Sequence, residues 1–276
     1  SRRQRQMCIR DRGYLELSKQ ELEKEYGNLV KRFEEFKGMG LNLNMARGKP
    51  SKEQLDFSLP MLDTINSKSD FIGEDKMDCR NYGLLNGITE CRKLFADILG
   101  VDAENVIVGG SSSLNMMFDT ISCFMTAPAV EGCKPWYEVK NRKFLCPVPG
   151  YDRHFGITQY YGFELIPIPM DDNGPDMDMV ERLVSEDDSI KGIWCVPKYS
   201  NPAGITYSDE VVKRFAALKP AAKDFRIMWD NAYCIHEISD TPDVLLNIMD
   251  ECKKTGNEDL PILFLSLIHI SEPTRR

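Results

Sequence analysis

Four short apolar runs, each followed by small or polar residues and then by a helical pattern, constrain the fold of this chain more than any other feature. They are 105–110 (NVIVGG), 143–147 (KFLCP), 191–197 (KGIWCVP) and 225–229 (FRIMW). Strands that alternate with helices are typical of a largely parallel sheet covered on both faces. The sequence therefore predicts an α/β fold with three layers, α/β/α, and a mostly parallel sheet. Ligands of such sheets bind at the carboxyl ends of the strands, where the polar residues of this chain lie.

The chain divides into segments of different character. Residues 1–12 (SRRQRQMCIRDR) and 265–276 (LSLIHISEPTRR) resemble translated sequencing-adapter sequence, and we expect both to be non-native. Residues 13–75 are predicted to form an N-terminal helix and arm, with a helix over 17–36 that begins at Ser18 and has a capping box with Glu21. Residues 76–264 are predicted to form a larger, truncated domain, in which 127–141 is a surface loop.

Composition excludes several classes of protein. A formal charge of −8, from 35 basic and 43 acidic residues, argues against nucleic-acid binding. The apolar stretches are shorter than the ~20 residues that cross a bilayer, so no membrane segment is expected. Nine scattered cysteines without a CxxC pair favour a reducing, cytoplasmic location. With only three histidines and none at ligand spacing, no metal site is predicted.

Two strand ends carry residues that could hold a charged ligand. Gly110, Ser111 and Ser112 lie between a predicted strand and a helix, where free N–H groups and hydroxyls suit a phosphate. The same residues would also serve as an ordinary helix cap. Asp230 closes an apolar strand, and a buried carboxylate needs a cation or a donor. A protonated pyridinium, a metal or an arginine would each meet that need.

Three further motifs are ambiguous when each is taken alone. Asn201 lies in Asn-Pro-Ala-Gly, which is also common turn chemistry. Tyr151 follows Pro-Gly at a strand end, where packing is an alternative role. Tyr82 precedes a helical run over 88–98 and could equally be a surface residue.

In combination, the motifs carry a resemblance to a known family. Tyr82-x4-Gly87, Gly-Gly-Ser-Ser, Pro-Gly-Tyr, Asn-Pro-Ala-Gly and Asp-x-Ala-Tyr occur in the order found in class I and II aminotransferases, which are fold-type-I pyridoxal-phosphate enzymes. The segment 41–50 (LNLNMARGKP) resembles the aspartate-aminotransferase-like subgroup, also described as MocR-type or alanine-glyoxylate-type. The resemblance covers 17–264. It implies a truncated large cofactor-binding domain over 76–264 and, over 13–75, the N-terminal part of a small domain.

The resemblance also implies roles for individual residues. Asp230 would pair with the pyridine nitrogen of pyridoxal 5′-phosphate and keep it protonated, so that the ring can accept electrons. Tyr233 and Asn201 would bind the phenolate oxygen of the cofactor. Tyr151 would cover the ring face of the cofactor, and its phosphate would be bound by Gly110, Ser111 and Ser112. In a homodimer, Tyr82 would reach the phosphate bound to the neighbouring subunit. The substrate would be contacted by Gly48 and Asn201.

One departure from the family pattern affects function. The Schiff-base lysine of the family follows the strand that here reads PILF, and this chain has LSLIHISEP instead. The resemblance thus predicts a parent aminotransferase that moves an amino group between an amino acid, such as aspartate or glutamate, and a 2-oxo acid. This chain is predicted to be an inactive fragment. The alternatives are a decarboxylase or carbon-sulfur lyase on the same scaffold, a non-catalytic sensor domain of a transcription regulator, and, last, a nicotinamide dehydrogenase, which the lack of GxGxxG disfavours.

Overall fold

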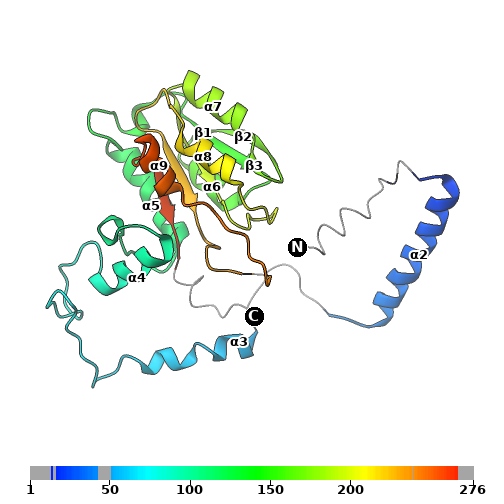
Figure 1. Cartoon of the computed structure of the whole chain (residues 1–276), viewed down its shortest axis with the longest axis horizontal. Coiled ribbons are helices and arrows are strands. Elements are labelled where there is room, and N and C mark those ends of the chain that lie inside the picture. Colours follow the sequence, from blue (N-terminus) through cyan, green and yellow to red (C-terminus); the bar gives the residue numbers. More distant parts are fainter. Residues whose placement is uncertain (1–13, 15–16, 43–50, 238, 267–276) are drawn as a thin grey trace. The chain divides into compact units, whose positions relative to one another are not determined.

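The computed structural model describes residues 14, 17–42, 51–237 and 239–266, in two compact units, Ser1–Lys52 and Glu53–Arg276. In the first unit, α2 spans Lys19–Gly38 (Figure 1). The Ser18 hydroxyl accepts a hydrogen bond from the backbone of Glu21, whose carboxylate accepts from the Ser18 N–H at 2.9 Å. This capping box satisfies two donors that a helix start leaves free. The predicted helix and its cap are confirmed.

The second unit contains a sheet of six strands in the order β3-β2-β1-β4-β5-β6 (Figure 1). All neighbouring strands run parallel except β2 and β3, which are antiparallel. The chain extends the sheet outward from β1 through β2 to β3 and then returns to the other side of β1 with β4. The strand order therefore reverses between β1 and β4. The strands are β1 Lys143–Val148, β2 Glu164–Asp171, β3 Gly174–Pro175, β4 Ile190–Cys195, β5 Arg226–Asp230 and β6 Pro261–Phe264.

Helices follow the strands and cover both faces of the sheet. The α-helices of this unit and its border are α3 Lys52–Asp56, α4 Thr89–Leu99, α5 Ser113–Thr126, α6 Asp152–Tyr160, α7 Met177–Glu186, α8 Asp209–Ala216 and α9 Ile248–Thr255. Short 3-10 turns are η2 Leu59–Asp63, η3 Ala103–Asn105 and η4 Trp136–Glu138. Within the described ranges, no helix is long and apolar enough to cross a membrane.

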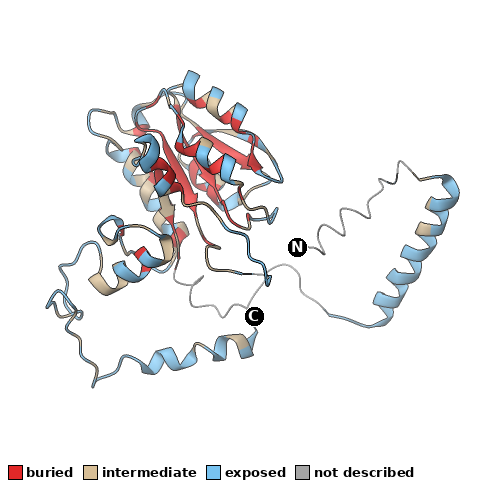
Figure 2. Cartoon of the chain, in the orientation of Figure 1, coloured by how far each residue is buried: buried red, intermediate tan, exposed pale blue. Residues whose placement is uncertain are grey.

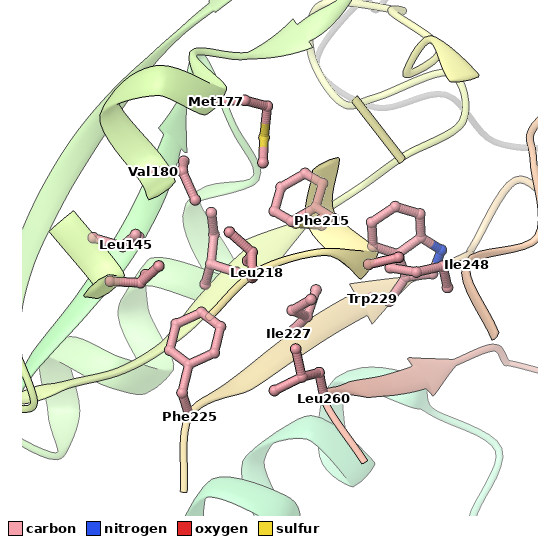
Figure 3. Packing of buried hydrophobic residues seen from close by; sticks show 14 of the residues in the cluster. Leu145, Met177, Val180, Phe215, Leu218, Phe225, Ile227, Trp229, Ile248 and Leu260 are labelled. Carbon is pink, nitrogen blue, oxygen red and sulfur yellow. The ribbon is translucent and has the colours of Figure 1, made fainter. Parts of the chain in front are cut away.

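Alternate residues of the central strands enter two separate cores. Ile193 and Ile227 point to the side packed by α7, α8 and α9, where Phe215 and Trp229 are also buried (Figure 3). Trp194 belongs to the opposite core, with α5 and α6. This alternation follows from the two-residue period of a strand, and Figure 2 shows buried residues concentrated in the sheet. The predicted three-layer α/β/α fold is confirmed.

Two segments differ from the sequence-based prediction. The run 105–110 is not a strand: it starts in η3 and continues without a sheet neighbour among the described residues, and Val108 N–H instead donates to Asn86 O at 3.0 Å. Residues of this run and of β6 line the same groove of about 310 Å³. The segment 127–141 is not wholly a surface loop either. Trp136 is fully buried and donates from Nε1 to Asp224 Oδ2 at 2.9 Å, which anchors the segment in the core.

Candidate functional site

Two of the predicted site residues, Tyr151 and Asn201, meet where the strand order reverses, together with His154, which was not predicted. Parallel sheets bind ligands at this switch point, because the loops of neighbouring strands diverge there. Tyr151 follows β1, His154 lies one turn further in α6, and Asn201 lies in the loop after β4. All three line one small cavity of about 20 Å³. The expectation that ligand-binding residues meet at the carboxyl ends of the strands is therefore consistent with the geometry.

Asp230 ends β5, the strand that pairs with β4 on the other side from β1. It is 7% exposed, and its Oδ2 lies 3.0 Å from Nε2 of His154, which is 1% exposed. An ionised carboxylate only accepts hydrogen bonds, so the imidazole donates through Nε2–H. His154 is one of the three histidines of the chain, and this contact was not predicted from the sequence. The available signal was its position three residues after Tyr151, the N-cap of α6.

The second carboxylate oxygen of Asp230 tests whether a cofactor fits. Oδ1 is buried and has no hydrogen-bond partner among the described residues. A buried charged oxygen without a donor is costly, so this arrangement leaves one strong acceptor for a ligand N–H. A protonated pyridine nitrogen has that donor. The residues present therefore fit the group that the sequence analysis expected.

Aromatic rings hold His154 in place beside Asp230. The imidazole stacks on Trp194 of β4, with ring centroids 4.7 Å apart and an angle of 17° between the planes. Tyr151 meets the same imidazole edge-on, at 5.0 Å and 89°. Trp194 is itself fixed by a hydrogen bond from Nε1 to Thr158 Oγ1 at 3.3 Å. Because Trp194 and Tyr151 restrict the imidazole from two directions, His154 presents its donor to the Asp230 carboxylate in a fixed orientation.

The predicted phosphate loop lies at the start of α5. Ser112 caps the helix, and its hydroxyl accepts from Asn115 N–H at 3.4 Å, so the helix-cap interpretation of this residue is confirmed. Ser111 and Gly110 are exposed, and a side chain at Gly110 would meet nothing within 4 Å. The exposure of Gly110 and Ser111 leaves the segment before this helix open to solvent, as a phosphate site requires.

Comparisons with known proteins give the family. The family model described as "Aspartate amino-transferase" matches residues 17–273, most of the chain. The chain belongs to the aspartate aminotransferase family. Among curated relatives, an aspartate aminotransferase of Corynebacterium glutamicum is 46% identical over 230 residues, which are 83% of this chain and 53% of that protein. A putative aminotransferase of Mycolicibacterium smegmatis is 42% identical, over 87% of this chain and 56% of that protein.

Solved structures agree with this family assignment. A crystal structure of an aspartate transaminase from Corynebacterium glutamicum superposes with a TM-score of 0.81 at 43% identity, over 91% of this chain and 59% of that one. A putative aminotransferase from Corynebacterium diphtheriae gives a TM-score of 0.80 at 42% identity, over 90% and 61%. The chain spans about half the length of the curated relatives it matches. The family uses pyridoxal 5′-phosphate, and the family prediction is confirmed.

The other predicted site residues are not all brought to this region. Tyr82 is 93% exposed, on the segment that leads into α4. Tyr233 lies three residues after Asp230, and its ring meets that of His236 edge-on, with centroids 5.8 Å apart. Gly48 lies outside the described residues. Within the parts of the chain that the structure describes, no cluster of three or more His, Cys, Asp or Glu could hold a metal ion.

Proposed function

We propose that this chain is the cofactor-holding part of a pyridoxal-phosphate-dependent aminotransferase and that it does not itself catalyse transamination. The parent protein would move an amino group between an acidic amino acid, aspartate or glutamate, and a 2-oxo acid. The observation that carries the proposal is the buried Oδ1 of Asp230, which has no partner among the described residues, beside the His154 donor. The 46% identical relative is an aspartate aminotransferase, which supports the acidic substrate.

Each residue of the site would have one physical task. Asp230 would hold a proton on the pyridine nitrogen, and His154 would orient the carboxylate. Tyr151 would cover the ring face, while Asn201 and Tyr233 would donate to the phenolate oxygen. Gly110, Ser111 and Ser112 would bind the phosphate through the start of α5. When bound, the cofactor supplies the electron sink that amino-group transfer needs.

The proposed inactivity of this chain is supported by the composition of the residues after β6. The sequence from 265 to 276 contains no lysine, so no amine is available there to hold the cofactor covalently or to move the substrate proton. Among the described lysines near the site, Lys198 is engaged with Glu237 at 2.8 Å. Gly48, in the sequence motif Arg-Gly-Lys-Pro, remains a proposed substrate contact.

A two-part experiment tests this function. The 276-residue chain is dialysed against pyridoxal 5′-phosphate, and bound ligand is measured before and after borohydride reduction. We expect reversible binding and no covalent pyridoxyl label at an active-site lysine, together with no glutamate- or aspartate-dependent turnover. A longer form that continues past β6 with the family's lysine should show both the label and turnover. Transamination by the 276-residue chain, or its absence from the longer form, would contradict the proposal.

A homodimer of the parent protein is part of the same proposal. Tyr82 is 93% exposed and Leu85 is 94% exposed, so two large side chains in one loop are available to a partner surface. In a dimer with shared sites, Tyr82 would reach the phosphate of the neighbouring subunit. Replacing Tyr82 by Phe in the longer form should weaken cofactor binding without dissociating the dimer in sedimentation experiments. Unchanged cofactor affinity would remove Tyr82 from the site.

A further inference from the structure

Lys198 links the loop that follows β4 to the loop that follows β5. Its side chain is only 6% exposed, and its Nζ lies 2.8 Å from Oε1 of Glu237. The same ammonium donates to the carbonyl of Cys234 at 3.2 Å. A lysine with so little contact with water requires such partners, because an unpaired buried charge is strongly unfavourable. The interaction therefore ties the two loops together.

The residue next to Lys198 makes a second link to the same carboxylate. The Tyr199 hydroxyl donates to Oε2 of Glu237 at 3.2 Å and accepts from the Asp243 N–H at 3.1 Å. Tyr199 has a φ of +48°, a left-handed conformation that a residue with a β-carbon adopts at a cost. Both oxygens of Glu237 are thus bound by consecutive residues of the β4 loop. This shared carboxylate gives the loop junction a defined geometry.

The β4 loop transmits this anchoring to Asn201. Tyr207 N–H donates to Pro197 O at 2.8 Å, and Ser200 N–H donates to Ile205 O at 2.8 Å. These bonds close the loop on itself, with Asn201 near its tip. Because the loop is closed at its base by bonds that flank Lys198, a displacement of Lys198 displaces Asn201 as well.

The β5 loop is anchored in a similar way. Asn231 N–H donates to Phe264 O at 2.9 Å, and Cys234 N–H donates to Asn231 O at 3.1 Å. Tyr233 lies between these bonded residues and directly precedes Cys234, whose carbonyl Lys198 holds. The position of Tyr233 relative to Asn201 therefore depends on the Lys198 contacts.

We propose that Lys198 is a positioning residue: through Glu237 and the Cys234 carbonyl, it sets the separation of Asn201 and Tyr233, so that both reach one oxygen of a phosphorylated pyridine ligand. The inference rests on the proposed function, because that function makes these two side chains ligand donors. Lys198 does not itself line the cavity formed by Tyr151, His154 and Asn201.

A matched control lies at the opposite end of the same two strands. Lys191, in β4, pairs with Asp224, just before β5, with Nζ 2.7 Å from Oδ1, and both side chains are buried. Lys191→Met thus removes a buried lysine pair between the same strands, but at the amino ends, away from the proposed ligand. A purely structural role for Lys198 would make the two variants behave alike.

The first measurement needs no ligand. Hydrogen exchange of the loops 199–206 and 231–237 is compared in the unsubstituted chain, Lys198→Met and Lys191→Met. We expect exchange in both loops to become about tenfold faster or more in Lys198→Met, because a hydrogen-bonded charge pair is lost there. Lys191→Met should leave these loops protected. Glu237→Gln, which keeps the shape of a half-exposed side chain, should act in the same direction if Lys198→Met does not fold.

The second measurement uses pyridoxamine 5′-phosphate, which needs no lysine for binding. Lys198→Met should lower the affinity for this ligand about tenfold, because a displaced Asn201 or Tyr233 would lose its hydrogen bond to the charged ligand oxygen. The substitution should also shift the absorption maximum of the bound ligand. Lys191→Met should leave the absorption maximum unchanged. Equal loop exchange, or equal spectra, in the two lysine variants would overturn the positioning role. If the unsubstituted chain binds no pyridoxamine 5′-phosphate, the proposed function fails, and the exchange result alone decides whether Lys198 fixes the loops.

Discussion

Replacement of His154 by Phe tests the Asp230 pair in isolation. Phenylalanine preserves a ring against Trp194, where the imidazole stacks at 4.7 Å, so little packing is lost. What disappears is the donor 3.0 Å from Asp230 Oδ2. Asp230 Oδ1 has no partner among the described residues. The substitution would therefore remove the hydrogen bond from His154 and leave the carboxylate without a partner among these residues. Breaking a buried charged pair costs about 3–5 kcal/mol, and one hydrogen bond to a charged group contributes about 1.5–3 kcal/mol.

From these bounds we expect His154→Phe to lower the free energy of unfolding by about 2–3 kcal/mol, the lower range because Asp230 keeps some contact with water. Urea unfolding followed by tryptophan fluorescence at pH 7 measures it. On an Asp230→Asn background the same substitution should cost under about 1 kcal/mol, because no charge is stranded. A loss of less than about 0.5 kcal/mol in the single variant, or equal losses in both backgrounds, would refute the reasoning.

Three other predictions concern the same unit. Gly150→Ala should destabilise the folded chain by about 1–3 kcal/mol in thermal unfolding, because the added β-carbon would lie 2.3 Å from Pro147 O. As a control, Gly156→Ala in α6 should be neutral or stabilising, because its β-carbon would meet nothing within 4 Å. Burial raises the pKa of Asp187, but hydrogen bonds from Lys143 and Ser189 outweigh it and hold the pKa at about 2. This stabilisation is present above the unfolded pKa of about 3.9 and is lost as pH falls through about 2, so Asp187→Asn should flatten the pH dependence of urea unfolding in that window. Iodoacetamide should label the exposed Cys79 and Cys123 first and Cys252 only after unfolding, because burial raises the pKa of the Cys252 thiol to about 12. Peptide mapping measures the order of labelling, and labelling of Cys252 before the other two would contradict this prediction.

The central strands were predictable from the sequence because they are buried on both faces. Runs such as KGIWCVP and FRIMW have few polar residues, and the polar residues that follow them mark the carboxyl ends. β2 was harder to recognise: Pro167 and Pro169 interrupt it, and most of its residues are exposed or partly exposed. The run 105–110 has the composition of a strand but has no sheet neighbour among the residues that the structure describes, and a strand requires a ladder partner.

Residue types at strand ends predicted part of the candidate site. Contacts between residues far apart in the sequence were not predicted. Asp230 was identifiable as a carboxylate that closes an apolar run, but its partner His154 lies 76 residues earlier. Lys198 and Glu237 are similarly separated by 39 residues. No local spacing encodes such pairs, because they arise only when the parallel strands bring their following loops together.

The charge state of the ring nitrogen in bound ligand tests the central claim most directly. Pyridoxamine 5′-phosphate labelled with ¹⁵N in the ring is bound to the 276-residue chain and to Asp230→Asn, and the nitrogen chemical shift is followed by NMR from neutral to alkaline pH. With Asp230 facing the nitrogen, the bound ring should stay protonated to a higher pH than the free ligand, and Asp230→Asn should abolish the difference. A ring nitrogen that titrates identically in free ligand, unsubstituted chain and variant would contradict the account.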